Sequence, residues 1–264
     1  MKLAAPLSAL LLTLTLFCSA AKAQKSEVKT LIPHVYNSVA ELFIETESGS
    51  MKMACTATAF ERKTQSGTPV VYKYRFVSAA HCVPGDSDSQ QKQQKFFISD
   101  DVRGEKTFTE AKLVEAGDKS KGDDFSLFEV ESGNLYEFIP LGDNKKLELD
   151  DSVISVAAPH GLGKQFFIGY VSQLNLDRPP IDAGIVQWTD LMQIEIGGGP
   201  GSSGSSIVSV DQGAIVGFLV GSASSDIGKL CVPVSKFKKF VELVDSGKYK
   251  KERKSGELPT GSEE

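Results

Sequence analysis

Four serine hydroxyls lie within one glycine-rich run, GGGPGSSGSS, at positions 197–206. A serine hydroxyl becomes a nucleophile when a neighbouring base accepts its proton, so each of Ser202, Ser203, Ser205 and Ser206 is a candidate. Composition alone is typical of a flexible linker. The run is flanked, however, by IVQWTDLMQIEI and SIVSVDQGAIVGFLVG, whose apolar and β-branched residues predict strands. We therefore interpret the run as a shaped turn between two core strands.

A base and an acid stand at the ends of two other apolar segments. His81 ends the stretch FVSAAHCV, and imidazole is the side chain best suited to accept a proton near neutral pH. Asp123 and Asp124 directly precede the apolar stretch FSLFEV, so one of these carboxylates must lie close to the hydrophobic interior. Each feature alone is common in proteins without catalytic activity. The other two histidines, His34 and His160, are expected near the start of the domain and in a turn, without a catalytic role.

Taken together, the three segments resemble those of the chymotrypsin or trypsin-like serine peptidases. That family carries a catalytic His, Asp and Ser in this chain order, with the serine in a Gly-x-Ser-Gly turn. The segment VISVAAPHGLGKQFFIGYVSQL, at 153–174, is similar to the corresponding part of bacterial HtrA/Deg-type proteases. The resemblance covers roughly residues 35–245. The sequence differs from HtrA in that no PDZ-sized region follows. The resemblance therefore gives no ground to expect the regulated oligomer of HtrA.

The resemblance implies a role for each of these residues. Ser203 corresponds to the nucleophile, His81 to the general base and Asp124 to the acid that orients the imidazole, with Asp123 as the rival acid. The backbone N–H groups of Gly201 and Ser203 correspond to the oxyanion hole. Such a mechanism hydrolyses peptide bonds through an acyl-enzyme and needs no cofactor. The alternative is a trypsin-fold module that binds a peptide or a partner without cutting it.

The resemblance also places the binding site for the substrate's P1 side chain, the residue before the cleaved bond. The residues implied are Gly197, Gly198, Gly199, Phe218, Leu219, Val220 and Gly221. Because no acid occupies Gly197, a preference for lysine or arginine is not expected. The stretch FLVG, at 218–221, lacks the histidine that glutamate-selective members of the resembling family carry, so an acidic P1 residue is not expected either. We predict an uncharged P1 residue, small or aliphatic, provided that Phe218 or Leu219 does not block the site.

The N-terminus predicts export. Lys2 is followed by a mostly apolar stretch and by the small-x-small sequence Ala21-Lys22-Ala23, typical of a signal peptide over residues 1–23 cleaved after Ala23. An uncleaved anchor helix is the alternative. We expect a secreted or periplasmic protein that has no membrane segment after cleavage. Cleavage removes two lysines and no acid, which lowers the formal charge from −5 to −7 and argues against a nucleic-acid partner.

Three cysteines remain after cleavage: Cys55, Cys82 and Cys231. In the resembling family a disulfide ties the histidine loop to the preceding strand, which implies a bond between Cys55 and Cys82. Cys231 is then single and is expected to be a buried apolar residue. No Cys-x-x-Cys pair occurs, and the only His beside a Cys is His81, so no metal site is expected.

About a dozen short strand-like runs with turns between them predict an all-β protein. The resemblance implies two six-stranded antiparallel barrels, at about 35–140 and 147–234, within a protease domain over 24–245. Helical spacing of Val234, Phe237, Phe240, Val241 and Val244 predicts a C-terminal helix over about 235–246, capped by Ser235. Residues 61–69 and 84–95 read as polar surface loops. The charged tail, 247–264, is expected to be disordered.

Overall fold

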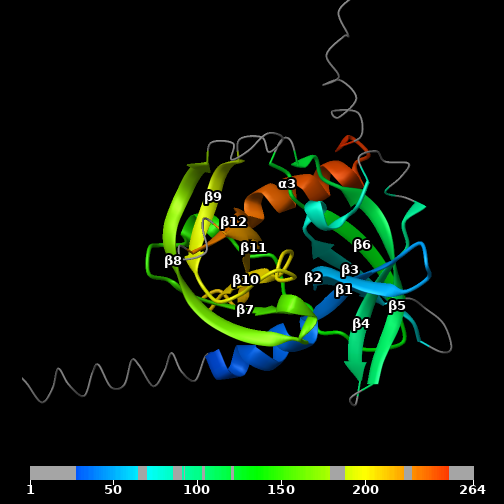
Figure 1. Ribbon diagram of the computed structural model, residues 1–264. Helices are drawn as coiled ribbons and strands as arrows, with labels where there is room; N and C mark the ends of the chain where they lie inside the picture. The colour runs from blue at the N-terminus through cyan, green and yellow to red at the C-terminus, as the bar shows by residue number, and fades with distance from the viewer. Residues whose placement is uncertain are drawn as a thin grey trace, which may run out of the picture.

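Twelve strands form two closed antiparallel barrels (Figure 1). The computed structural model describes residues 28–64, 70–85, 91, 93–102, 105–119, 122–178, 188–222 and 228–249. The predicted signal peptide, half of the 84–95 loop and the tail beyond Tyr249 lie outside these residues. In the part of the chain that the structure describes, no helix is both long and apolar enough to cross a membrane.

The N-terminal barrel follows a described helical segment, residues 28–38, and has the strand order β1-β2-β3-β6-β5-β4. Its strands are β1 (Val39–Glu45), β2 (Met51–Thr64), β3 (Tyr72–Ser78), β4 (Phe96–Val102), β5 (Glu105–Ala116) and β6 (Ser126–Ser132). The C-terminal barrel has the order β10-β11-β12-β9-β8-β7. Its strands are β7 (Ser152–Ala157), β8 (Gln165–Arg178), β9 (Trp188–Glu195), β10 (Ser206–Ser209), β11 (Ala214–Ser222) and β12 (Lys229–Pro233). The expected fold class, two six-stranded antiparallel barrels, is confirmed.

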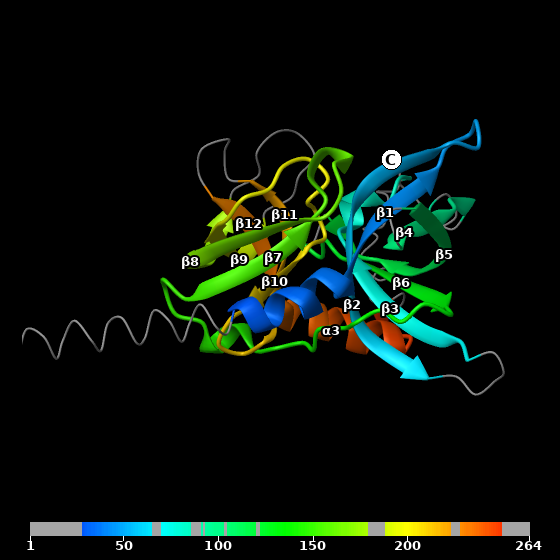
Figure 2. The ribbon, with the colours of Figure 1, turned by 90° about the horizontal axis from the view of Figure 1, so that it is seen from below.

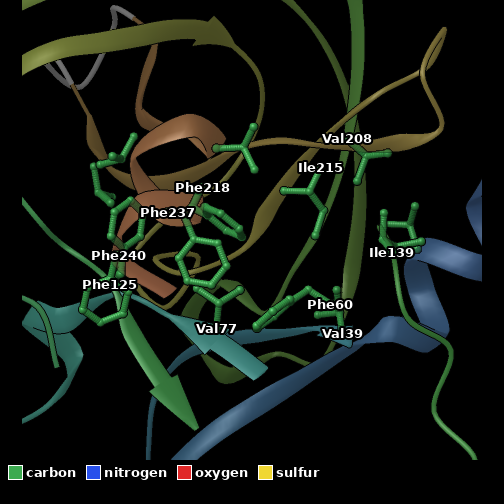
Figure 3. Packing of buried hydrophobic residues seen from close by; sticks show 14 of the residues in the cluster. Val39, Phe60, Val77, Phe125, Ile139, Val208, Ile215, Phe218, Phe237 and Phe240 are labelled. Atoms are coloured by element: carbon green, nitrogen blue, oxygen red, sulfur yellow. The ribbon is translucent and has the colours of Figure 1, made fainter. Parts of the chain in front are cut away.

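The barrels lie side by side, and helix α3 (Val234–Asp245) packs across their junction (Figures 1 and 2). Each barrel has its own apolar interior, and a third core fills the space between them. Figure 3 shows that this junction core combines Phe60 from β2, Phe218 from β11 and Phe237 from α3. The ring of Phe237 lies 5.1 Å from that of Phe60 and 4.8 Å from that of Phe218. Helix α3 therefore joins the two halves of the molecule.

Two local predictions are wrong. Residues 61–64 do not belong to a loop but extend β2, where Glu61 to Thr64 pair with Arg75 to Tyr72 of β3. This segment lacks apolar alternation, and its strand conformation is maintained by the ladder and by an ion pair between Glu61 and Arg75. Ser235 does not cap α3 with its side chain. Instead, the N–H group of Ser235 donates to Oδ1 of Asn144, so the cap comes from a distant segment.

The segment after α3 also differs from the expectation of disorder over its first residues. Gly247, with φ of +69°, follows the end of the helix, where glycine is common. Tyr249 is then buried, at 6% exposure, with its ring against that of Phe240. The composition of 247–264 is polar on average, but one aromatic ring buries enough apolar surface to hold these residues on the domain.

Candidate active site

His81 and Asp124 meet between β3 and β6. His81 lies in a single 3-10 turn, Ala80–Cys82, directly after β3. Its Nδ1 atom lies 2.7 Å from Oδ2 of Asp124, and its backbone N–H donates to Oδ1 at 2.8 Å. The Asp124 side chain is 1% exposed, whereas that of His81 is 37% exposed. A buried carboxylate thus holds one side of the imidazole while part of the ring remains accessible to solvent.

The loop before β6 determines which of the two acids faces His81. A side chain on Gly117 would collide with the carbonyl oxygen of Asp123, and the N–H of Gly117 donates to the carbonyl of Phe125 at 2.7 Å. These contacts bring Gly117 close to the segment 123–125, which ends in the fully buried Phe125. Asp123 is half-buried and accepts a hydrogen bond at 3.3 Å from the hydroxyl of Tyr249. Asp124, and not Asp123, is therefore the partner of the imidazole.

The turn that carries Ser203 packs against the segment that leads to His81. The carbonyl of Ser203 accepts from the N–H of Thr56 at 3.0 Å. A side chain on Gly204 would lie 2.5 Å from Oγ of Ser78 and 2.8 Å from the backbone nitrogen of Ala79, which is two residues before His81. Gly204 also has φ of +84°, a conformation that glycine adopts readily. Glycine at this position allows the turn to approach β3 closely.

Only one of the four serines in the run is accessible. Ser202, Ser205 and Ser206 are each 0% exposed, whereas Ser203 is partly exposed. The hydroxyl of Ser202 also has a structural partner, because it accepts from the N–H of Gly199 at 3.1 Å. Among the four hydroxyls, the structure therefore leaves that of Ser203 for a substrate.

Backbone donors near Ser203 fall into two groups. The N–H groups of Ser202 and Gly204 donate to the carbonyls of Gly199 and Leu219. Those of Gly201 and Ser203 have no hydrogen-bond partner within the residues that the structure describes. Two unused donors beside the accessible hydroxyl are what an oxyanion hole requires.

Thr56 is a residue of this site that sequence reasoning missed. Its side chain is fully buried, and Oγ1 donates to the carbonyl of Gly201 at 2.8 Å while it accepts from the N–H of Ala158 at 3.0 Å. A hydroxyl on β2 thereby links the serine turn to the end of β7. The only signal in the sequence is a polar residue directly after Cys55, which by itself indicates no role.

A disulfide joins Cys55 of β2 to Cys82, the neighbour of His81. The two sulfurs and a ring nitrogen of His81 all lie within 4.8 Å of one another. Because the sulfurs are bonded to each other, this cluster offers no pair of thiolates to a metal ion. Cys231 is free and fully buried, and burial raises the pKa of its thiol.

The residues expected to bind the P1 side chain fall into two groups. Gly197, Gly198 and Gly199 lie at or near the surface, in the turn before Ser203. A methyl group on Gly197 would lie 2.5 Å from the ring of Phe167, so this ring covers the position where a basic-specific peptidase would need an acid. His160, expected to be a plain turn residue, lies against this turn. Its backbone N–H donates to the carbonyl of Pro200, and its ring atom Nε2 would lie 2.7 Å from a methyl group on Gly199.

The strand residues expected to bind the P1 side chain, 218–221, do not all face the same region. Phe218 is 1% exposed and packs on Phe125 and Phe237 in the junction core, so its side chain neither lines nor blocks an open site. Val220 also belongs to this core, and Leu219 belongs to the interior of the C-terminal barrel. Consecutive residues of a strand face opposite sides, so the side chains of the whole range 218–221 cannot line one site. Of the strand residues, Gly221 alone is partly exposed.

Two six-stranded barrels, with a histidine, a buried aspartate and an accessible serine at their junction, define the chymotrypsin-like fold class. The sequence pattern of the trypsin-like peptidase domain matches residues 65–218, more than half of the chain. The chain therefore belongs to the family of trypsin-like peptidase domains. No curated protein sequence matches it.

Solved structures of HtrA-type proteases share the fold. The chain superposes on Deg5 with a TM-score of 0.61 at 17% identity, over 84% of this chain and 96% of Deg5. It matches the HtrA-type protease AlgW with a decapeptide at a TM-score of 0.62 and 14% identity, over 83% of this chain and 67% of AlgW. For AlgW with a tripeptide, the TM-score is 0.60 and the identity 17%, over 82% of this chain. The chain spans 63% of the length of that AlgW structure.

Proposed function

We propose that this protein is a secreted serine endopeptidase in which Ser203, His81 and Asp124 form the catalytic triad. One observation carries the proposal: a buried carboxylate binds both the imidazole and the backbone N–H of His81, beside a turn in which one serine of four is accessible. AlgW with a bound tripeptide and decapeptide supports a peptide or protein substrate.

We propose the following reaction for these groups. Oγ of Ser203 attacks the carbonyl carbon of the substrate while Nε2 of His81 accepts its proton. Asp124 holds the other ring nitrogen and stabilises the imidazolium that forms. The N–H groups of Gly201 and Ser203 donate to the oxyanion of the tetrahedral intermediate. The imidazolium then protonates the leaving amine, which gives an acyl-enzyme, and water repeats the sequence to release the acid.

Labelling with a fluorophosphonate and hydrolysis of casein test this mechanism on the mature chain, beginning at Gln24. We expect one covalent adduct, at Ser203, and a loss of hydrolysis by about 10⁴-fold or more in Ser203→Ala. Ser48→Ala, a change at an exposed serine in the β1–β2 turn, serves as the matched control and retains full activity. A folded protein that neither takes the label nor cleaves casein contradicts the proposal and favours a module that binds peptides without cutting.

Export is part of the proposal. The sequence of residues 1–23 supports it, and a disulfide between Cys55 and Cys82 is compatible with an oxidising compartment. Mass spectrometry of the protein recovered outside the cytoplasm is expected to show an N-terminus at Gln24. Retention of residues 1–23 in a membrane fraction would support the uncleaved anchor instead.

The glycines at 197–199 support an uncharged P1 residue, as the sequence predicts, and the absence of an acid at Gly197 disfavours a basic one. The uncharged preference rests on the turn before Ser203 alone. A charged side chain that faces this turn from another strand would change the preference.

A further inference from the structure

Lys229 lies beside the glycine turn that precedes Ser203. It is the first residue of β12 and pairs with Ser222 at the end of β11 and with Ile194 on β9. A methyl group on Gly198 would lie 3.8 Å from Cε of Lys229 and 3.2 Å from Oγ of Ser202. The side chain of Lys229 thus lies next to the residue that is five positions before the nucleophile.

The strand alternation of β12 gives the direction of this side chain. Leu230 and Val232 belong to the junction core, whereas Cys231 packs inside the C-terminal barrel with Ile194. Residues two apart on a strand share a face, so Lys229 lies on the same face as Cys231. It lies at the partly exposed end of that face, next to Gly198, and its hydrogen bond to Ser222 is exposed.

The charge of Lys229 has no acidic partner among the residues that the structure describes. Nζ donates to the neutral hydroxyl of Ser222 at 3.0 Å, and no carboxylate within the described ranges forms an ion pair with it. The side chain is only partly buried. An ammonium in an exposed hydrogen bond to a hydroxyl retains donors that can bind a ligand carboxylate.

From this placement we infer that Lys229 recognises an acidic P1 side chain, so that the peptidase cleaves after aspartate or glutamate. The inference rests on the proposed function, since it concerns the substrate of the same site. The glycine turn offers no side chain that would block the approach of a carboxylate to Nζ. A basic P1 residue is disfavoured twice, because the site lacks an acid at Gly197 and contains the charge of Lys229.

Lys229 was not among the residues singled out from the sequence, because it opens the apolar stretch KLCVPV and reads as the solvated start of a strand. Only the antiparallel pairing with Ser222 and the approach of Gly198 place it beside the nucleophile turn. Asp226 lies outside the described residues. The test therefore compares substrates of different P1 charge, because their cleavage depends on all the charges near the site.

The test uses fluorogenic peptides that differ only in P1, with the isosteric pair Glu and Gln compared alongside Ala and Lys. For the wild-type mature protein we expect kcat/KM to be about tenfold higher for Glu than for Gln, and this ratio to fall as salt is added. Lys229→Met should bring the ratio to about one, Lys229→Arg should retain it, and Lys229→Glu should shift the preference towards Lys.

Lys112→Met is the matched control, because it removes the same charge from an exposed position on β5 of the other barrel. It should leave the Glu-to-Gln ratio unchanged. The inference is overturned if the wild-type protein cleaves the Ala and Gln substrates as efficiently as the Glu substrate, or if the Glu-to-Gln ratio is unchanged in Lys229→Met. The peptidase mechanism stands in either case. Absence of cleavage for every peptide, together with no fluorophosphonate label, is a failure of the proposed function instead.

Discussion

Thr56 uses both hydrogen-bonding capacities of its hydroxyl to join three segments of the chain. It donates to Gly201, whose own N–H is one of the two unused donors, and it accepts from Ala158 at the end of β7. Its backbone N–H binds the carbonyl of Ser203 as well. A buried polar group with every function satisfied fixes the geometry around it. Thr56 is therefore a positioning residue for the turn that carries the proposed oxyanion donors.

Replacement of this hydroxyl should reduce turnover. In Thr56→Val the carbonyl of Gly201 and the N–H of Ala158 both lose their partner, so we expect kcat to fall by about tenfold with KM little changed. Thr56→Ser keeps the hydroxyl and should restore most of kcat. Steady-state kinetics with one peptide substrate measures the two parameters. If Thr56→Val and Thr56→Ser had equal kcat values, the hydroxyl would have no part in positioning the turn.

Helix α3 packs against both barrels. Three of its residues, Val234, Phe237 and Phe240, are buried in the junction core, with Phe237 in contact with rings from both barrels. At the far end of the helix, the guanidinium of Arg75 on β3 forms two hydrogen bonds with the carboxylate of Asp245. Apolar packing and an ion pair thus attach one helix to both halves.

Truncation of the central ring should therefore destabilise the whole domain. We expect Phe237→Ala to lower the free energy of unfolding by about 3–5 kcal/mol, because it leaves a cavity between the barrels. Urea titration followed by tryptophan fluorescence measures this change. Leu149→Ala, at a side chain that is 63% exposed, is the control and should change the free energy by less than about 0.5 kcal/mol. A loss for Phe237→Ala as small as that of the control would show that the junction core contributes little.

At the scale of the whole molecule, the proposed catalytic groups lie at the surface where the two barrels meet. His81 and Asp124 come from the N-terminal barrel, whereas Ser203 and the unpaired N–H groups beside it come from the turn before β10 of the C-terminal barrel. The disulfide between Cys55 and Cys82 holds β2 next to the turn that carries His81. An intact site thus requires that both barrels fold and dock.

The state of the cysteines gives a prediction for the folded molecule. Cys231 is 0% exposed and burial raises the pKa of its thiol, so the native mature protein should show no thiol that reacts rapidly with Ellman's reagent. Unfolding without reductant should reveal one thiol, and reduction should reveal three. Rapid reaction of one thiol in the native protein would contradict the burial of Cys231, and rapid reaction of three thiols would contradict the disulfide as well.

The sequence by itself determined the features that depend on local pattern and order. The alternation of apolar residues predicted the strands, and the spacing of Phe237 and Phe240 predicted α3. The order of His81, Asp124 and Ser203, with glycines around the serine, indicated the class of enzyme. The structure brings His81 and Asp124 into contact and leaves Ser203 accessible.

Only the tertiary structure decided the features that depend on contacts between distant segments. Asn144 caps α3, Thr56 holds the turn of Ser203, and Lys229 lies beside Gly198, although no local pattern marks any of these residues. Likewise, the strand residues expected near the substrate divide between two cores, because alternate side chains on β11 face opposite sides. The physical reason is that hydrogen bonds and charge contacts act over a few ångströms in space, and the closing of two barrels sets which residues come within that distance.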